Sequence, residues 1–284
     1  MLPTTSHQGT THGDSRKGGP MLFSVGTTAP GHTPSSQTPS VTIVIPALNE
    51  AGNLPSVLPR IPLWVHEVIL VDGGSTDNTI EVAQRLLPDI RIVHQTGRGK
   101  GDALGAGFRM ATGDVIAMID ADGSTDPCEI PRFLSALRTG ADFVKGTRYV
   151  QGGGSQDLTA FRSLGNRALT GIVNTFWRTN YTDLCYGYIA FWRHHLNVLT
   201  PDCRGFEIET LLCIRAAGRG LRVAEVASYE SSRISGTSNL HATRDGIRVF
   251  RTIISELAKP WLCACTELNY YLFLIPIFFL DHEK

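Results

Sequence analysis

The sequence has no surplus of charge of either sign. Lysine and arginine together number 26, and aspartate and glutamate also number 26, so the formal net charge at pH 7 is zero. Proteins that bind nucleic acid through its phosphates usually carry a basic excess, and this chain has none. The composition therefore gives no electrostatic reason to expect a nucleic-acid partner.

The cysteines lack the spacing of a disulfide framework or of a zinc site. No two of them form a CxxC pair, and the close pair Cys263 and Cys265 has no second pair at a familiar spacing. We therefore expect reduced, mostly buried thiols in a cytosolic protein. The six positions are Cys128, Cys185, Cys203, Cys213, Cys263 and Cys265.

Long apolar runs are also missing. The apolar stretch at residues 270–280 is shorter than the about 20 residues that a membrane-spanning helix needs. Residues 1–40 hold few large apolar side chains, which predicts a disordered tail rather than a signal peptide. In residues 241–284, Ile247, Phe250, Ile254 and Leu257 recur at helical spacing among arginines, as in a basic amphipathic helix at a membrane interface. A buried core segment or an oligomer contact remains an alternative for this end of the chain.

Short apolar runs alternate with helical patterns between residues 41 and 240, and this alternation predicts an α/β domain. It favours a single, mostly parallel sheet with helices on its faces. The expected strands are residues 41–46, 67–72, 90–94, 115–122, 141–149 and 221–227, the last of these being the final strand, and residues 189–192 form a further short apolar run. The expected helices end near residues 60, 87, 111, 177 and 217.

The strand expected at residues 115–122 ends in two carboxylates, Asp120 and Asp122. Side chains alternate along an extended chain, so both carboxylates lie on one side and can reach a single cation. Ligands of open α/β sheets collect at the carboxyl ends of the strands. Hard oxygen ligands of this kind suit Mg²⁺ or Mn²⁺. A polar loop after a strand would explain the motif equally simply.

A glycine cluster at residues 97–107 does not match either familiar nucleotide-binding motif. Lys100 and Gly101 precede Asp102 where a Walker loop needs Ser or Thr, and Leu104 stands where a dinucleotide fingerprint needs glycine. A looser interpretation brings backbone amides and the Lys100 ammonium near a phosphate. A plain flexible turn accounts for the glycines nearly as well.

Taken together, these motifs resemble glycosyltransferase family 2, within it the group of dolichol-phosphate mannosyltransferases and dolichyl-phosphate glucosyltransferases. The resemblance covers about residues 41–257. Its landmarks are Asn49-Glu50, Asp72 to Thr79, Gly99-Lys100-Gly101, Asp120-Ala121-Asp122, Gly146 to Tyr149, Asp183-Leu184 and Arg233 to Ser238. The resemblance implies a GT-A fold, a nucleoside-diphosphate-sugar donor, a divalent metal and inversion at the anomeric carbon.

The family's functional residues map onto this chain as expectations. The catalytic residues would be Asp120, Asp122, Asp183 and Arg148, and the metal would be held by Asp120, Asp122 and Ser124. The donor would be bound by Pro46, Asn49, Glu50, Asp72, Ser75, Lys100, Asp120, Ala121 and Arg233. The acceptor would meet Arg148, Arg162, Asp183 and Glu207. The arginines suit phosphates because a guanidinium makes two parallel charge-assisted hydrogen bonds; a surface ion pair is the simpler explanation for each.

Three positions depart from the family pattern. Gly73 stands where many members have a second aspartate, Ser124 follows the acidic motif where mannosyltransferases often have a longer polar ligand, and Asn239 replaces a familiar lysine. The sequence therefore leaves UDP-glucose and GDP-mannose open as the type of donor.

We expect an enzyme that moves a hexose to a polyprenyl phosphate at the cytoplasmic membrane face, with Mg²⁺ or Mn²⁺ as cofactor. If a soluble hydroxyl acceptor took its place, a carboxylate would have to accept the proton, and Asp183 or Glu207 would be the candidate. Two alternatives of other classes are a nucleotide-sugar-binding protein without activity, against which the intact Asp120 and Asp122 argue, and a nucleotidyltransferase. Nucleotidyltransferases usually carry a basic glycine-rich signature near the first strand, and this chain lacks that signature there.

Overall fold

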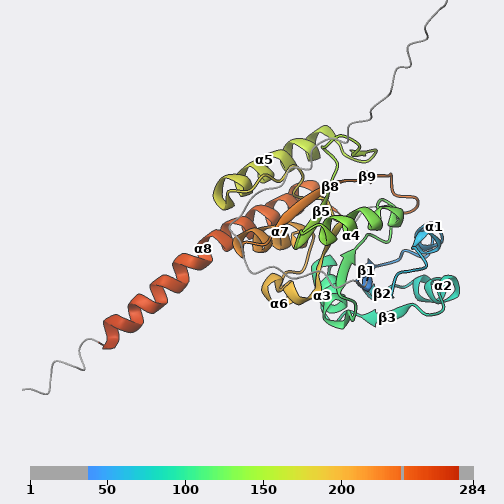
Figure 1. The fold of residues 1–284 in the computed structure, drawn as a ribbon, viewed down its shortest axis with the longest axis horizontal. Coiled ribbons are helices and arrows are strands. Elements are labelled where there is room, and N and C mark those ends of the chain that lie inside the picture. Colours follow the sequence, from blue (N-terminus) through green and yellow to red (C-terminus); the bar gives the residue numbers. More distant parts are fainter. Residues whose placement is uncertain (1–37, 238–239, 275–284) are drawn as a thin grey trace, which may run out of the picture.

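The computed structural model describes residues 38–237 and 240–274, with side chains up to residue 259 (Figure 1). The strands are β1 Val41–Ala47, β2 Glu67–Asp72, β3 Arg91–His94, β4 Val115–Met118, β5 Phe143–Thr147, β6 Gly154–Ser155, β7 Ile189–Trp192, β8 Val223–Ala227 and β9 Tyr229–Glu230. The α-helices are α1 Leu54–Val57, α2 Thr79–Leu86, α3 Lys100–Met110, α4 Ile130–Arg138, α5 Ala160–Trp177, α6 Leu196–Leu199, α7 Ile208–Gly218 and α8 Ala242–Leu274. Short 3₁₀ turns lie at Leu58–Arg60, Pro127–Glu129 and Arg193–His195.

The main sheet has seven strands in the order β3-β2-β1-β4-β7-β5-β8. All neighbours pair in parallel except β7, which runs antiparallel to both β4 and β5. The predicted α/β class with a mostly parallel sheet is therefore confirmed. Strands β2 and β3 are added on one side of β1, and β4 is added on its other side. A crevice at the carboxyl ends of the strands is expected where the order switches in this way, between β1 and β4.

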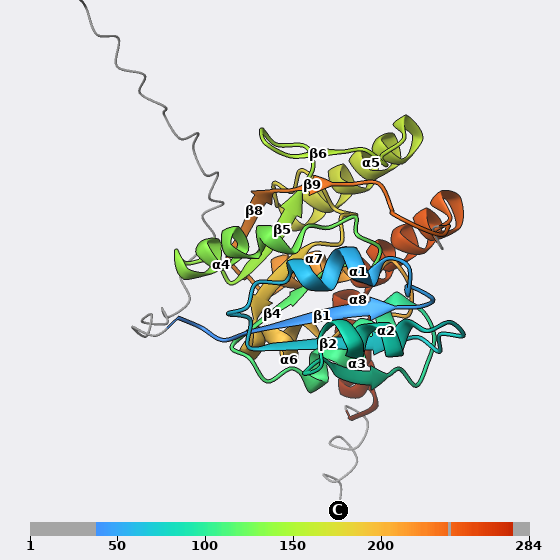
Figure 2. The ribbon, with the colours of Figure 1, turned by 90° about the vertical axis from the view of Figure 1, so that its right-hand side faces the viewer.

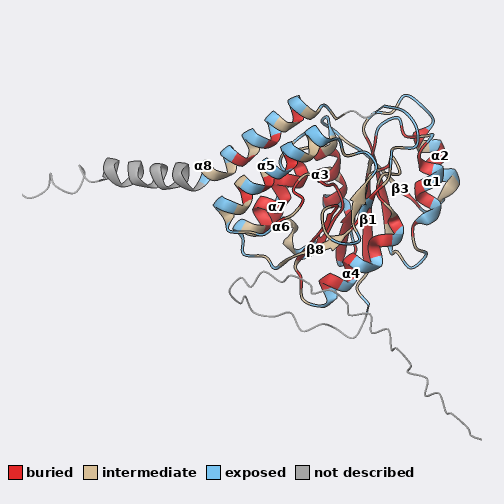
Figure 3. Ribbon diagram, turned by 90° about the horizontal axis from the view of Figure 1, so that it is seen from above, coloured by how far each residue is buried: buried red, intermediate tan, exposed pale blue. Residues whose placement is uncertain are grey.

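Side-chain alternation along β1 builds a core on each face of the sheet. Val41, Ile43 and Ile45 join one apolar cluster, whereas Val44 joins the other. Helices α1, α2 and α4 cover the first face, and α3, α5, α7 and the start of α8 cover the second. Figure 2 shows these layers around the sheet, and Figure 3 shows that the buried residues gather on the strands and on the inner sides of the helices.

Several boundaries differ from the sequence-based expectation. The fourth strand ends at Met118 rather than at Asp122, because the chain beyond it leaves the sheet and bonds elsewhere. The Asp120 amide donates to the Thr125 hydroxyl, and the Asp122 carbonyl accepts from the Ile234 amide. The carboxylates thus project from a loop, and strand alternation is not what brings them together.

Two further corrections concern elements that the sequence patterns concealed. A short strand, β9, follows β8, which was expected to be the last, and it pairs with β6 in a separate two-stranded sheet. Helix α4 was not expected, although its apolar residues Phe133, Leu134 and Leu137 pack into the first core. Of the four cysteines with described side chains, Cys213 is buried and Cys128 is exposed, so the expectation of mostly buried thiols was too simple.

Helix α8 lies in the region where the sequence pattern suggested an amphipathic helix, and its two faces differ in burial. Val249 and Ile253 are buried against the second core, whereas Ile247, Phe250 and Ile254 are each about half exposed. None of the helices in the described ranges combines the length and apolarity needed to cross a bilayer. Residues 1–37 of the predicted disordered tail, residue 239 and the end of the apolar tail lie outside the described residues.

Candidate active site

The loop that follows β4 carries Asp120 and Asp122 to the boundary between two cavities. Lys100, Asp120, Asp122, Phe206 and Arg233 line both the smaller cavity, of about 350 Å³, and the larger one, of about 640 Å³. Gly123 adopts a positive φ of 82°, and this conformation, which favours glycine, turns the chain directly after the second carboxylate. The two carboxylates therefore face the place where the contents of both cavities would meet.

Lys100, at the start of α3, is the nearest cation to Asp120. Its Nζ lies 2.6 Å from Asp120 Oδ1 and 2.8 Å from Glu209 Oε1. Burial by itself would lower the pKa of Lys100, but the two carboxylates outweigh it and hold that pKa above the ordinary value. Burial raises the pKa of Asp120 to about 6, and Asp122 adds to this rise while Lys100 opposes it.

Arg233 crosses from the segment after β9 to the loop after β1. Its guanidinium makes a bidentate pair with Glu50, with nitrogen-to-oxygen distances of 2.9 and 3.1 Å, and one nitrogen lies 3.4 Å from Asp122 Oδ2. The backbone holds the same arrangement, because the amides of Ser231 and Ile234 donate to the carbonyls of Ser124 and Asp122. Residues separated by more than 180 positions thereby close one side of the site.

The smaller cavity lies at the carboxyl end of β1, beside the point where the strand order reverses. It is lined by Pro46, Glu50, Lys100, Asp120, Ala121 and Arg233 among the expected donor residues. Three other expected residues instead shape the neighbouring turn: Asn49 Oδ1 accepts from the Thr76 amide, Asp72 accepts from the Gly74 and Ser75 amides, and Ser75 Oγ accepts from the Asn49 amide. The turn is thus braced by side chains behind the cavity wall.

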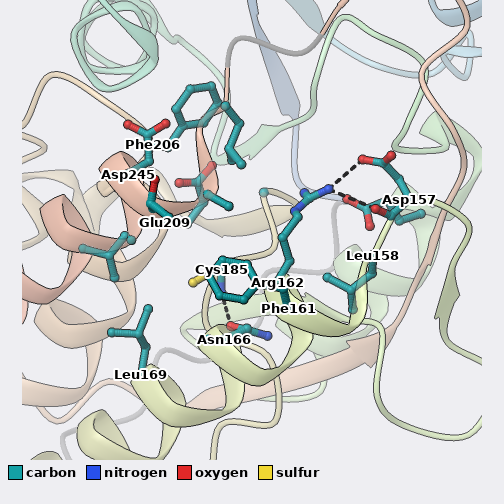
Figure 4. A pocket seen from close by; sticks show the side chains of 18 of the residues that line it. Asp157, Leu158, Phe161, Arg162, Asn166, Leu169, Cys185, Phe206, Glu209 and Asp245 are labelled. Carbon is teal, nitrogen blue, oxygen red and sulfur yellow. Dashed lines mark hydrogen bonds and ion pairs between the residues drawn. The ribbon is translucent and has the colours of Figure 1, made fainter.

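The larger cavity extends from the carboxylates into an apolar groove between α5 and α8. Its polar end includes Asp120, Asp122 and Ser124, whose amide donates to Asp122 Oδ1. Figure 4 shows Phe161 and Leu169 on α5 beside this space, with Glu209 and Phe206 opposite. Further apolar lining comes from Leu158, Ile172, Ile247, Val249 and Phe250.

Arg148 and Asp183, both expected to be catalytic, form a buried ion pair behind the larger cavity. Arg148 Nε and Nη2 donate to the two oxygens of Asp183 at 2.7 and 2.9 Å, and Nη1 donates to Glu230 at 2.9 Å. Asn166 donates to Asp183 at 2.8 Å. Burial would raise the pKa of Asp183, but the hydrogen bonds and charge of Arg148 outweigh it and keep that pKa below its usual value. Asp183 lines neither cavity, whereas the edge of Arg148 does reach the larger one.

The two remaining acceptor candidates differ in whether they reach the larger cavity. Arg162 lines the cavity on α5, and its Nη1 donates to the carbonyl and carboxylate of Asp157 (Figure 4). Glu207 lines neither cavity, and its Oε1 accepts from the amides of Arg204 and Gly205. Arg162 is therefore positioned to meet a ligand, while Glu207 lies at the start of α7 with its side chain bound to the preceding loop.

The glycine cluster is explained by close backbone packing. A Cβ on Gly101 would lie 2.6 Å from the Cys203 carbonyl oxygen, and the Gly101 amide already donates to the Arg204 carbonyl. Because this amide is used inside the protein, it is not free for a phosphate, whereas Gly99 and Lys100 line the smaller cavity.

Sequence reasoning missed Glu209, Phe206 and Glu230 as site residues. Glu209 holds Lys100, Phe206 lines both cavities, and Glu230 completes the partners of Arg148. The one signal available was the acidic pair of Glu207 and Glu209 at the start of a helix, where acids also serve as ordinary helix-terminal charges.

The donor set around Asp120 fits a hard divalent cation only in part. Among the described residues no group of three or more His, Cys, Asp or Glu side chains could hold a metal ion. Two carboxylates nevertheless suit Mg²⁺ or Mn²⁺, because these ions commonly take one or two protein carboxylates and complete their shell with substrate phosphates and water. The smaller cavity beside the carboxylates offers the space for such phosphates.

The comparisons with known proteins agree with this geometry. Residues 42–209 match the family described as Glycosyl transferase family 2. The undecaprenyl-phosphate mannosyltransferase of Micrococcus luteus is 32% identical over 78% of this chain and 96% of its own length. The polyprenol monophosphomannose synthase of Mycolicibacterium smegmatis is 32% identical over 74% of this chain and 85% of its own.

Among solved structures, glucosyl-3-phosphoglycerate synthase from Mycobacterium tuberculosis in complex with phosphoglyceric acid is similar, with a TM-score of 0.63 and 25% identity over 79% of this chain and 85% of that one. The same enzyme has been solved with Mn²⁺ and UDP-glucose. The fold is the GT-A fold, and this chain belongs to glycosyltransferase family 2 as one of its enzymes.

Proposed function

We propose that this glycosyltransferase moves a hexose from a UDP-glucose or GDP-mannose type donor to a polyprenyl phosphate, with inversion at the anomeric carbon. The observation that carries the proposal is the continuity of the larger cavity, which joins Asp120 and Asp122 to the apolar groove between α5 and α8. A phosphate needs a polar, cationic end and a prenyl chain needs an apolar channel, and this cavity offers both.

The donor would occupy the smaller cavity, with its diphosphate near Lys100 and Arg233. Arg233 is held by Glu50 in the ligand-free protein, so we expect it to exchange part of this pair for a phosphate, which a guanidinium binds in the same bidentate manner. Asp120 and Asp122 would hold Mg²⁺ or Mn²⁺, with Ser124 beside them. The metal, when bound, supplies positive charge for the leaving diphosphate.

The acceptor phosphate would approach from the larger cavity, near Arg162. It is already anionic near neutral pH, so the reaction needs no strong general base. Arg148 and Asp183 would position the wall of this cavity through their buried pair rather than touch the reacting atoms. The chain's own contribution is therefore to hold the two substrates in line and to keep their charges compensated.

The two polyprenyl-phosphate relatives named above support this acceptor. The exposed apolar side chains of α5 and α8, including Phe161, Leu164, Ile247 and Ile254, are compatible with a peripheral contact between this side of the molecule and the cytoplasmic membrane face. A hydroxyl acceptor would require a carboxylate that accepts a proton. Asp183 is buried and Glu207 lines neither cavity, so neither carboxylate faces the expected position of such an acceptor.

The test is transfer of labelled hexose from UDP-glucose and from GDP-mannose to polyprenyl phosphate in detergent, with Mn²⁺ or Mg²⁺. We expect label from one donor in the organic phase. Label that never enters that phase, while the donor is consumed with a soluble hydroxyl acceptor, would overturn the lipid assignment.

Phe250 and Ile254 provide a matched pair of variants for the groove. Both are about half exposed on α8, but Phe250 lines the cavity and Ile254 does not. Phe250→Ala should raise the KM for polyprenyl phosphate by roughly 5- to 30-fold, since it removes about 1–2 kcal/mol of apolar contact. The donor KM should not change, and Ile254→Ala should leave both constants as they are.

A further inference from the structure

Lys100 and the expected metal ion would compete for the same carboxylate. The ammonium of Lys100 lies 2.6 Å from Asp120 Oδ1, and its side chain is only 11% exposed. A divalent cation bound to Asp120 would therefore stand within a few ångströms of a fixed positive charge. Two cations at that separation repel each other strongly, so metal binding requires the ammonium to move away from Asp120.

Glu209 gives the displaced ammonium a second partner. Its Oε1 already lies 2.8 Å from Lys100 Nζ, and the Glu209 side chain is 4% exposed, on the first turn of α7. Gly187 leaves the space around this pair open: a Cβ there would come within 3.0 Å of both Lys100 Nζ and Asp120 Oδ2, and within 3.3 Å of Glu209 Oε1. The Lys100 ammonium can therefore leave Asp120 and still keep the negative charge of Glu209 beside it.

Lys100 also borders both cavities, so a small movement keeps its ammonium beside the donor. We propose that Lys100 is a resident counter-cation for Asp120 in the metal-free protein. In this proposal Glu209 is a positioning residue that keeps the ammonium when a divalent metal takes Asp120, and so directs it to the donor diphosphate. The inference rests on the proposed function for the identity of that diphosphate.

The proposal predicts that metal and nucleotide bind cooperatively. Without a nucleotide, the metal must displace Lys100 into a site that then holds two cations and three carboxylates: Asp120, Asp122 and Glu209. The three carboxylates already balance the metal and the ammonium in formal charge, but a nucleoside diphosphate adds oxygen ligands for the metal and a new partner for the displaced ammonium. Each ligand should therefore tighten the binding of the other by the same factor.

The test measures Mn²⁺ binding to the full-length protein by electron paramagnetic resonance, first without and then with UDP or GDP. Lys100→Met should bind Mn²⁺ about tenfold more tightly than the wild type in the absence of nucleotide, because the competing charge is gone. Glu209→Gln should bind it several-fold more weakly, because the ammonium then depends on Asp120 alone. Lys100→Arg should behave much like the wild type, since it retains the cation.

Arg98→Met is the matched control, because Arg98 is an exposed cation that lines the same smaller cavity. It should change Mn²⁺ affinity less than twofold. Lys100→Met should also lose the mutual tightening between Mn²⁺ and the nucleotide. A merely structural role for these residues would weaken Mn²⁺ binding in both Lys100→Met and Glu209→Gln, whereas the proposal requires changes of opposite sign.

The proposal is overturned if Lys100→Met, folded by thermal unfolding, binds Mn²⁺ no more tightly than Arg98→Met. It is also overturned if Glu209→Gln binds Mn²⁺ as tightly as Lys100→Met. Opposite changes in Mn²⁺ affinity, together with no transfer to polyprenyl phosphate by the wild type, would reject the proposed acceptor and leave this inference standing. Transfer to polyprenyl phosphate by the wild type, with unchanged Mn²⁺ affinities in both variants, would reject this inference and leave the proposed acceptor standing.

Discussion

Replacing Asp183 by asparagine removes one negative charge from the buried pair with Arg148 while almost preserving the shape of the side chain. Asp183 is fully buried and accepts four hydrogen bonds: from Nε, Nη2 and the backbone amide of Arg148, and from Nδ2 of Asn166. An asparagine offers one acceptor oxygen and turns an NH₂ group toward donors. The Arg148 guanidinium would then keep the Glu230 carboxylate and the Tyr186 ring as partners.

The cost should be large because neither charge can reach bulk water easily. Removing one partner of a buried ion pair costs roughly 3–5 kcal/mol. We expect Asp183→Asn to lower the urea midpoint of unfolding by more than about 1 M, given slopes of about 1–3 kcal/mol per molar. Transfer activity should fall only because less of the protein is folded and because the cavity wall shifts.

Asp142→Asn is a matched control at the surface. Asp142 binds Arg222 through the same three groups, Nε, Nη2 and the backbone amide, at 2.9 Å each, and lies 3.7 Å from His195 Nε2, but the Arg222 side chain is 53% exposed. Solvent screens such a pair, and its loss should cost about 1 kcal/mol or less. The difference between the two variants isolates the effect of burial.

The pH dependence gives a second measure of the same interaction. The pKa of Asp183 is lowered in the folded protein, so its contribution to stability is present above the unfolded pKa, near about 4, and is lost as the pH falls through the folded value. The stability difference between the wild type and Asp183→Asn should therefore be constant from pH 7 to about pH 5 and shrink below about pH 4. Equal stability of Asp183→Asn and Asp142→Asn, combined with abolished transfer by Asp183→Asn, would refute this reasoning and return Asp183 to a direct catalytic role.

Three further predictions follow from the site, the glycines and the thiols. Asp122→Asn should reduce transfer by roughly 10²- to 10³-fold without lowering the unfolding midpoint, as expected for a residue that stabilises developing charge; activity kept within a few-fold would exclude that role. Gly101→Ala should lower stability by about 1–3 kcal/mol, because its Cβ would lie 2.6 Å from a carbonyl oxygen, whereas Gly171→Ala, open on α5, should raise it by up to about 1 kcal/mol in the same denaturation assay. Burial raises the pKa of Cys213 to about 12, so mass spectrometry after alkylation at pH 8 should find the exposed Cys128 modified well before Cys213; equal rates would contradict the described burial.

The sequence predicted β1 and β2 well, because strand periodicity and apolar runs are properties of neighbouring residues. It also located Asp120 and Asp122 at the carboxyl end of a strand, since a run such as residues 115–119 marks where the strand lies. Helix α4 and strand β9 were missed, because short segments with mixed composition carry too little periodic signal.

By itself, the sequence determined the α/β class, the acidic motif and the ordered landmarks that indicate the family. Only the tertiary structure decided the partners of each charged side chain. Arg148 meets Asp183 across 35 residues, and Arg233 meets Glu50 across 183. Such pairings depend on where the sheet and its crossovers bring distant loops together, and no local pattern encodes that. The same physical reason explains why Lys100 and Glu209 became the central pair beside Asp120 only when the fold was known.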